Sequence, residues 1–326
     1  MSIPGFIDLQ VNGYYGVDYC SLSLTEEQFI RSCLALKQKG VVGFLPTIVT
    51  ASEEIYKHSL GIIRRCVDTD QRIRNMVLGV HLEGPFLSPV DGARGAHPLE
   101  FIKKPDLDLF DRLMEWSGDL LRLLTIAADQ PGADELCQYA TQQGVRVSLG
   151  HHLANYEQIL ELRKHGASGL THLGNANPHL VDRHKNPIIS GLAAQELCAM
   201  MITDGFHIPE ELIRLILNSR PAHGVCVVSD ASPFAGMPSG NYETIGLNVT
   251  LSESGRLFNP QTGYLVGSSF SMLECMNYVH SLGLLSETEL EMIGFANPLA
   301  YLGISTSLFE NEEVLSYSKT SGFTVR

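Results

Sequence analysis

The sequence predicts an α/β protein, a (β/α)8 TIM-like barrel with a small β excursion. Eight short apolar runs, rich in β-branched residues, alternate with segments of helical periodicity along the chain. This alternation favours a closed parallel barrel over an open doubly wound sheet. In addition, acidic or imidazole side chains follow four of the runs where each run ends. All barrel strands end on one face, so residues distant in sequence can converge there.

The expected elements follow one another in order. Three of the expected helices begin at a residue that is preferred at helix N-termini. These residues are Thr25, which precedes two glutamates, Asn155 and Pro209. The strands are expected at 3–11, 41–49, 76–82, 121–127, 145–149, 168–172, 197–203 and 225–229. The helices are expected at 25–39, 52–67, 132–143, 155–165 and 209–218.

One segment interrupts this alternation. Residues 240–266 alternate apolar and polar side chains with Gly and Asn-Pro between them, which is typical of antiparallel strands. Helical pattern then returns at 268–281 and 286–296. The insertion has too few strands to form an independent domain. We therefore assign the regions as barrel for 1–239 and 267–304, β insertion for 240–266, and C-terminal tail for 305–326.

Composition restricts the classes of partner. The 326 residues are 44% hydrophobic, and the formal net charge of −13 argues against a nucleic-acid partner. A small anionic substrate stays open, because a few local cations can dominate one pocket. The seven cysteines are odd in number and lack a CxxC pair, which indicates reduced thiols. The N-terminus lacks a signal-peptide pattern and no apolar run is long enough to span a bilayer, so a cytoplasmic, soluble protein is expected.

Four residues are the candidates for chemistry: Glu83, His151, His172 and Asp230. A single His after a strand is more often structural, but four such residues at the same topological position make coincidence a poor explanation. A carboxylate and two neutral imidazoles can hold a divalent cation and leave a position open for water. Asp230 is then the general base that takes a proton from water and returns one to a leaving amine. The alternative role of Asp230 is a structural one, as a helix or turn cap, which the following Ala-Ser-Pro also allows.

Other polar residues are secondary candidates. Asp204 and His207 follow the seventh strand and His97 follows Glu83, so each is a possible substrate-orienting group or a solvated loop residue. His152 is ambiguous because it adjoins a proposed ligand. No role is expected for His58, His165, His179, His184, His223 and His280. The sequence has no GxSxG, P-loop or GxGxxG signature after a strand.

Several motifs occur together in a distinctive order. They are PGFIDLQVNG, HLEGPF, SLGHH, THLGNAN, DGFHI, VSDASPFAGMPSGNY and GYLVGSS. This series, which runs from Pro4 to about Ser271, resembles the N-acetylglucosamine-6-phosphate deacetylases of the amidohydrolase superfamily. The resemblance implies a barrel of the metal-dependent hydrolase type that converts N-acetylglucosamine 6-phosphate to glucosamine 6-phosphate and acetate. Gln10 and Asn12 replace the His-x-His of many amidohydrolases, which implies one divalent ion, zinc or iron.

The resemblance also implies roles for individual residues. Asp230 matches the catalytic Asp, and His97 matches the His that polarises the acetyl carbonyl. His207 matches a sugar-binding His. Asn175, Ala176 and Arg183 fall where the family binds substrate and phosphate, with part of that pocket supplied by the partner subunit of a homodimer.

The chain also departs from the family. Members usually have a further β segment before PGFID, so 240–266 is expected to lack its pairing partners and the tail to lack returning strands. Gly174 and Asn177 replace larger apolar residues, and Arg183 lies in DRHKNP, an altered phosphate motif. Two alternatives therefore stay open. One is a deacetylase of another N-acyl amino sugar, with or without phosphate. The other is a non-catalytic barrel that binds sugar phosphate or a protein partner.

Overall fold

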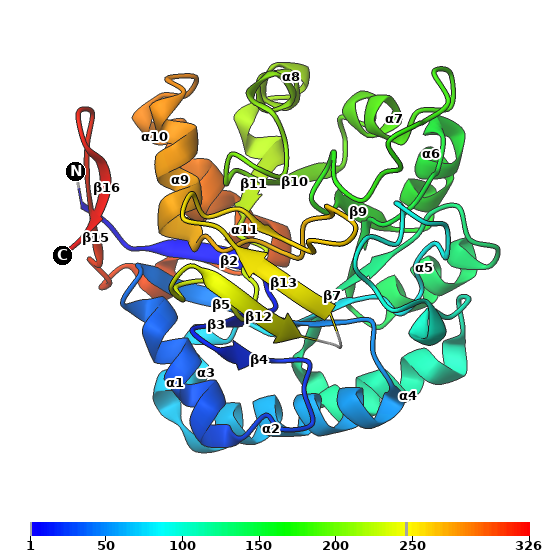
Figure 1. Ribbon diagram of the computed structural model, residues 1–326, viewed down its shortest axis with the longest axis horizontal. Coiled ribbons are helices and arrows are strands. Elements are labelled where there is room, and N and C mark those ends of the chain that lie inside the picture. Colours follow the sequence, from blue (N-terminus) through cyan, green and yellow to red (C-terminus); the bar gives the residue numbers. More distant parts are fainter. Residues whose placement is uncertain (1, 245–246) are drawn as a thin grey trace.

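The structure is a computed structural model that describes residues 2–244 and 247–326. Eight parallel strands form one sheet in the order β11-β10-β9-β8-β7-β6-β5-β2, with helices outside it (Figure 1). The expected barrel is therefore confirmed. The strands are β2 (Phe6–Val11), β5 (Val41–Val49), β6 (Val80–Glu83), β7 (Leu121–Ile126), β8 (Arg146–Leu149), β9 (Ala167–Leu170), β10 (Cys198–Ile202) and β11 (Val225–Val228).

The helices bury one face against this sheet. Thr25 and Asn155 each cap a helix by accepting the backbone N–H of a Gln three residues on, whose side chain bonds back to the cap. Pro209 precedes another helix, as expected. The main helices are α1 (Glu26–Lys37), α2 (Glu53–Thr69), α3 (Gln71–Met76), α4 (Leu107–Ser117), α5 (Ala133–Gln142), α6 (Tyr156–Lys164), α7 (Pro187–Ala193), α8 (Glu210–Ser219), α9 (Met272–Ser281), α10 (Glu287–Glu291) and α11 (Asn297–Leu302).

The barrel closes between β2 and β11. Ser229 follows β11 and donates hydrogen bonds from its backbone N–H, at 3.1 Å, and from its hydroxyl to the buried carboxyl of Asp8 in β2. One step further on, Val11 and Ala231 form a parallel bridge. Burial raises the pKa of Asp8 to about 7. A side chain thus supplies part of the hydrogen bonding that joins the first and last strands.

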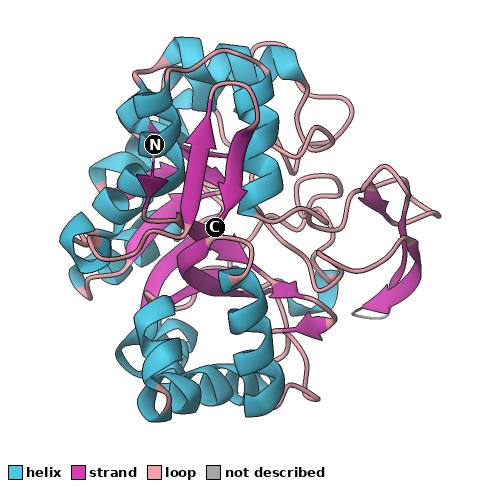
Figure 2. Ribbon diagram, turned by 90° about the vertical axis from the view of Figure 1, so that its left-hand side faces the viewer, coloured by secondary structure: helices cyan, strands magenta, loops and turns pink. Residues whose placement is uncertain are grey.

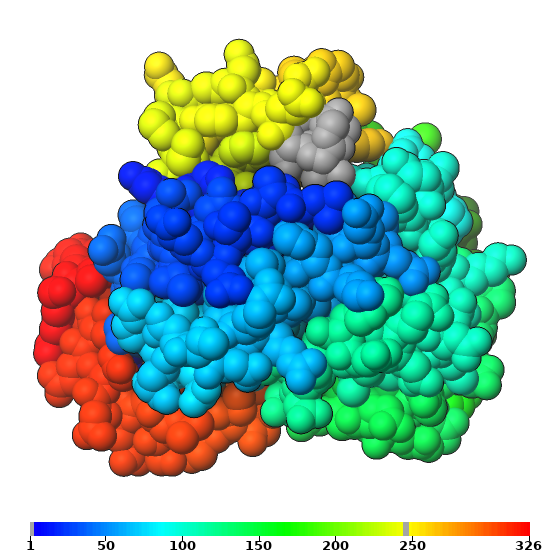
Figure 3. Space-filling view, turned by 90° about the horizontal axis from the view of Figure 1, so that it is seen from below, coloured from blue at the N-terminus to red at the C-terminus, as the bar shows by residue number. Residues whose placement is uncertain are grey.

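The β insertion has the predicted antiparallel form. It consists of β12 (Gly240–Thr244), β13 (Leu247–Leu251) and β14 (Leu257–Phe258), which pair with one another. The three strands project from the barrel (Figures 2 and 3). Phe234, Val249, Leu251 and Leu257 form a small core beneath them. The segment thus forms a sheet from its own three strands, and the expected loss of partners from a preceding β segment stays a prediction.

The tail contains strands that the sequence analysis did not expect. A hairpin is formed by β15 (Leu315–Ser318) and β16 (Gly322–Val325), and β1 (Ser2–Ile3) pairs antiparallel with β15. The strand expected at 3–11 is divided, because Pro4 and Gly5 interrupt it. The two termini consequently lie side by side at one edge of the barrel (Figure 1).

Two further expectations concern thiols and membranes. All seven cysteines are free, as expected. The closest thiols described are those of Cys198 and Cys226, whose sulfur atoms lie 3.4 Å apart. Within the described residues, no helix combines the length and apolar character that crossing a bilayer requires.

Candidate active site

The four candidate residues converge at the carboxyl ends of the barrel strands. Glu83 is the last residue of β6, while His151, His172 and Asp230 each lie two residues beyond a strand. These last three have φ values of 52°, 32° and 50°, in the left-handed region that side chains rarely adopt. Such backbone strain is typical of functional sites, where the surrounding structure holds it. The sharp turns bring the three side chains to one place.

The atoms that could hold a metal ion lie very close together. Glu83 Oε1 is 2.8 Å from His172 Nε2 and 3.2 Å from His151 Nε2, and the two nitrogens are 3.0 Å apart. Ligands at about 2.0–2.2 Å from one zinc ion lie roughly 3.3 Å from each other. All three side chains are buried. The donor set therefore fits one divalent cation in both chemistry and spacing.

His97 is a fourth group beside this cluster. Its Nε2 lies 3.6 Å from Glu83 Oε2, and Glu83, His97 and His151 form a group whose potential ligand atoms all lie within 4.8 Å. The other ring nitrogen of His97 accepts the backbone N–H of Thr50 at 3.4 Å. The cluster thus offers two overlapping ligand sets. The set with His172 is the tighter one, and His97 lies beside it.

The protonation states of Glu83 and His151 suit metal binding, whereas burial of His172 is outweighed by the hydrogen bond and charge of Glu83, which raise the pKa of His172. Burial opposes ionisation of Glu83, but the contacts of its carboxylate with the imidazoles of His151 and His172 outweigh it and hold the pKa of Glu83 well below its usual value. Burial, followed by repulsion from His97, lowers the pKa of His151 to about 4. Nδ1 of His151 lies 3.0 Å from the carbonyl oxygen of Ala93, so it is the nitrogen that donates and Nε2 keeps its lone pair.

Asp230 lies beside the cluster and is held by two amides. Asn12 donates to Asp230 Oδ1 at 2.7 Å, and Gln10 donates to the same oxygen at 3.0 Å and to Glu83 Oε1 at 2.8 Å. Burial, followed by repulsion from Glu83, raises the pKa of Asp230 to about 6. The sequence showed Gln10 and Asn12 only as replacements for histidines. Their contacts with Asp230 depend on the closure of the barrel, which no local pattern reveals.

A cavity of about 360 Å³ opens above the cluster, lined by the loops that follow the strands and by the loop after β14. His207 lines it and donates from Nδ1 to Asp204 Oδ2 at 2.7 Å. Burial opposes ionisation of Asp204, but the charge and hydrogen bonds of His207 lower the pKa of Asp204 to about 2. Asp204 itself lies behind His207, outside the cavity lining. The structure therefore places Asp204 as a support for His207.

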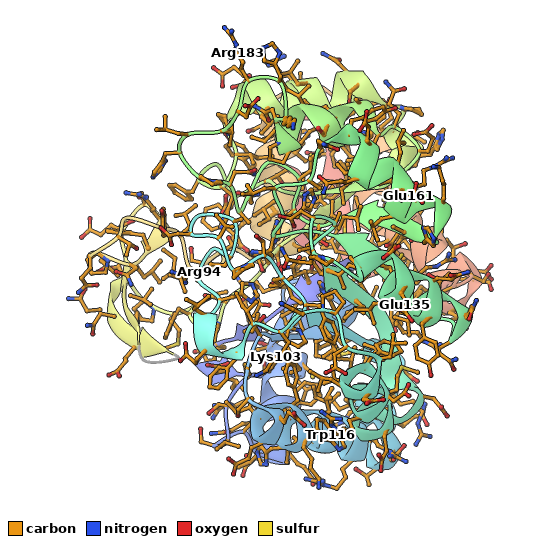
Figure 4. All side chains as sticks on the ribbon, turned by 90° about the vertical axis from the view of Figure 1, so that its right-hand side faces the viewer. Arg94, Lys103, Trp116, Glu135, Glu161 and Arg183 are labelled. Atoms are coloured by element: carbon orange, nitrogen blue, oxygen red, sulfur yellow. The ribbon has the colours of Figure 1, made fainter. Side chains whose placement is uncertain are left out.

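The other predicted residues divide into two groups. Asn175 and Ala176 line the cavity. Arg183 is exposed at the edge of the molecule, where its guanidinium contacts His184, and it does not line this cavity (Figure 4). His152 is buried and its Nδ1 accepts the backbone N–H of Ala154.

The sequence analysis missed some residues that line the cavity. His179, for which no role was expected, lines the cavity beside Tyr264. The only sequence signal was its position seven residues after His172 in the same loop.

Comparison with known proteins places this arrangement in a class and then in a family. The barrel with its buried Glu–His cluster is that of an amidohydrolase. No family model matches the chain. The sequence is 33% identical over 317 residues to the N-acetylglucosamine-6-phosphate deacetylase of Danio rerio, which covers 93% of this chain and 75% of that protein. The chain belongs to the N-acetylglucosamine-6-phosphate deacetylase family.

Two further similarities agree with this assignment. The crystal structure of N-acetylglucosamine-6-phosphate deacetylase from Pasteurella multocida superposes with a TM-score of 0.86, with 25% identity, over 98% of this chain and 84% of that one. An N-acetylgalactosamine-6-phosphate deacetylase from Escherichia coli O157:H7 is 29% identical over 302 residues, 92% of this chain and 78% of that protein. The chain is thus similar to deacetylases of two different amino-sugar phosphates.

Proposed function

We propose that this protein is a metal-dependent deacetylase that hydrolyses N-acetylglucosamine 6-phosphate to glucosamine 6-phosphate and acetate. The observation that carries the proposal is the convergence of Glu83, His151 and His172, with ligand atoms 2.8–3.2 Å apart, beside the buried carboxyl of Asp230. The family of the chain supports the choice of substrate.

One divalent cation is held by Glu83, His151 and His172. Carboxylate and imidazole ligands suit zinc, and iron(II) accepts the same set, so availability decides between them. Such a cation would supply Lewis acidity and would make nearby water more acidic. Gln10 and Asn12, being amides, offer no second pair of imidazole ligands, which supports a single ion.

Asp230 moves the protons of the reaction. Its carboxylate takes a proton from the attacking water as the water oxygen bonds to the acetyl carbon. His97 faces the developing oxyanion and stabilises it. The C–N bond then breaks, acetate leaves, and Asp230 passes its proton to the sugar nitrogen. His207, oriented by Asp204, binds a sugar hydroxyl, while Asn175 and Ala176 bind the far side of the substrate.

Arg183 acts in the pocket of a second subunit. Its exposed position outside the cavity of its own chain supports this role. Exposed apolar side chains lie on the same loop and the helices after it, Leu180 at 93% exposure, Ile189 in α7 and Leu215 in α8, and suit a homodimer interface. The seven free thiols fit the reducing cytoplasm as the site of action.

A second substrate is favoured by one observation. Among the described residues, the cavity lining includes no Lys or Arg, although the proposed substrate is anionic. A different N-acyl amino sugar, with or without phosphate, is therefore the second candidate, and the similarity to an N-acetylgalactosamine-6-phosphate deacetylase supports it as well.

The test is acetate release by metal-loaded protein. N-acetylglucosamine 6-phosphate, N-acetylgalactosamine 6-phosphate and unphosphorylated N-acetylglucosamine are compared, with Glu83→Gln as the near-isosteric control. We expect turnover of the first sugar and its loss in the control. Faster turnover of either other sugar supports the second candidate. Absence of acetate from all three, with metal bound, contradicts a deacetylase of this kind.

A further inference from the structure

The charged side chains that line the cavity are acidic, although the proposed substrate is itself an anion. Asp18, Glu83 and Asp230 line it, the described lining includes no Lys or Arg, and the whole chain carries a formal charge of −13. Cationic donors form the strongest hydrogen bonds to a phosphate group. Within one chain, that positive charge has to come from an imidazole.

Among the described residues, only one imidazole that lines the cavity does not contact a carboxylate. His97, His151 and His172 gather around Glu83, and His207 is tied to Asp204. His179 remains. It is exposed while it lines the cavity, so it lies at the mouth and not at the floor.

Two separate elements bring rings together at this mouth. His179 comes from the loop after β9 and Tyr264 from the loop after β14, and their ring centroids are 5.9 Å apart at an interplanar angle of 37°. The loop of His179 also packs closely against the backbone at Gly92, because a Cβ on Gly92 would lie only 2.6 Å from the Cα of Pro178.

The geometry of the sugar determines which group reaches this mouth. The acetamide on C2 has to lie at the buried cluster of Glu83, His151 and His172. In a pyranose ring, C6 and its phosphate lie across the ring from C2. With the acetamide at the floor, the phosphate points toward the mouth, where His179 and Tyr264 stand.

We propose that His179 and Tyr264 form a phosphate subsite that recognises the 6-phosphate of the substrate. This inference rests on the proposed function and deepens it. The imidazole of His179 donates a hydrogen bond to a phosphate oxygen, which is charge-assisted when the ring is protonated, and the Tyr264 hydroxyl donates a second. The subsite belongs to one chain, so it contributes to phosphate recognition beside any residue of a second subunit.

The test compares variants on sugars with and without phosphate. His179→Ala removes the charge, His179→Lys restores a cation, and His223→Ala is the matched control, an exposed His just before β11 at the opposite end of the barrel. For N-acetylglucosamine 6-phosphate, we expect KM to rise about 10–100-fold in His179→Ala, with kcat within about threefold. His179→Lys recovers most of the loss. KM for unphosphorylated N-acetylglucosamine stays unchanged.

An equal rise of KM for both sugars, or no rise, overturns the phosphate assignment. Calorimetric binding of glucosamine 6-phosphate separates this proposal from the proposed function. If the protein hydrolyses neither sugar, the function fails, yet weaker binding by His179→Ala than by the wild type and His223→Ala still supports the subsite. Equal binding by all three, or binding by none, overturns it.

Discussion

Asp230 is held beside the metal-binding cluster by neutral amides. Gln10 bridges Glu83 and Asp230 through one nitrogen, and Asn12 donates to the same oxygen of Asp230. The carbonyl oxygens of both amides are buried without a partner among the described residues. Neither amide bonds to the second carboxylate oxygen of Asp230, which the proposed proton transfer requires.

Removal of the metal provides the first prediction. Zinc should raise the Tm of the wild type, because a ligand that binds only the folded state adds stability, about 2.7 kcal/mol at a hundredfold excess over Kd. Glu83→Gln should lose most of this rise, and Glu161→Gln, an exposed Glu in α6, should keep it. Thermal unfolding with zinc and with chelator measures the shift. Equal shifts in all three proteins would exclude Glu83 as a ligand.

The sequence pattern located the site residues at strand ends, but it gave no role to His179 and Tyr264 in the loops. Glu83, His151, His172 and Asp230 were recognisable because each directly follows an apolar strand, and the barrel places all strand ends on one face. The positions of His179 and Tyr264 depend on two long loops that meet in space. Local pattern carries no information on such a meeting.

At the scale of elements, the unusual feature is the seam of the barrel, where the first strand, β2, meets the last strand, β11. The carboxyl of Asp8 is fully buried there and accepts hydrogen bonds from Ser229. Its pKa is raised from 3.8 to about 7, mainly by burial. The neutral form is therefore the form that the folded barrel prefers.

The seam predicts a pH dependence of stability. As pH rises from 3.8 toward about 7, the unfolded chain releases a proton that folded Asp8 keeps, so this group's contribution to stability falls. The loss is about 1.4 kcal/mol for each pH unit in that window. Asp8→Asn does not titrate and can still bond to Ser229, so its stability relative to the wild type should rise. Urea unfolding at about pH 5, 6 and 7 measures it. A difference that is constant or falls with pH would refute the prediction.

The elements were predictable to the extent that their pattern is local. Alternating apolar runs and capped helices identified all eight barrel strands and the three-stranded insertion. The hairpin of β15 and β16 was missed because its first strand pairs with β1, at the other end of the chain. Short, Ser- and Thr-rich strands whose partner is so distant leave little trace in the sequence.

At the scale of the whole molecule, this terminal sheet lies at one edge of the barrel, beside its base, the end at which the barrel strands begin. Phe323 of β16 packs edge-on against Phe6 of β2, with centroids 5.2 Å apart. The backbone of Phe323 also bonds to the side chain of Asn277 in α9, with an N–H···O distance of 2.7 Å. The active site occupies the opposite end of the same strands. Base and site are thus separate parts of one barrel.

This separation predicts a stability effect without a catalytic one. Phe323→Ala should lower the free energy of unfolding by about 3 kcal/mol, because it removes a buried ring and leaves a cavity. Thr324→Ala, at the exposed neighbouring position, should change it by less than about 0.5 kcal/mol. Turnover per folded molecule should be unchanged in both, as measured below the unfolding transition. Loss of turnover in folded Phe323→Ala would show that base and site are coupled.

The central claim is that Asp230 transfers protons beside a metal held by Glu83, His151 and His172. The most direct measurement is acetate release by Asp230→Asn and wild type at equal metal content. We predict that the variant retains its metal and fold but loses at least about a hundredfold in kcat, the scale of a general acid–base group. Near-normal turnover by the metal-loaded variant would contradict the account.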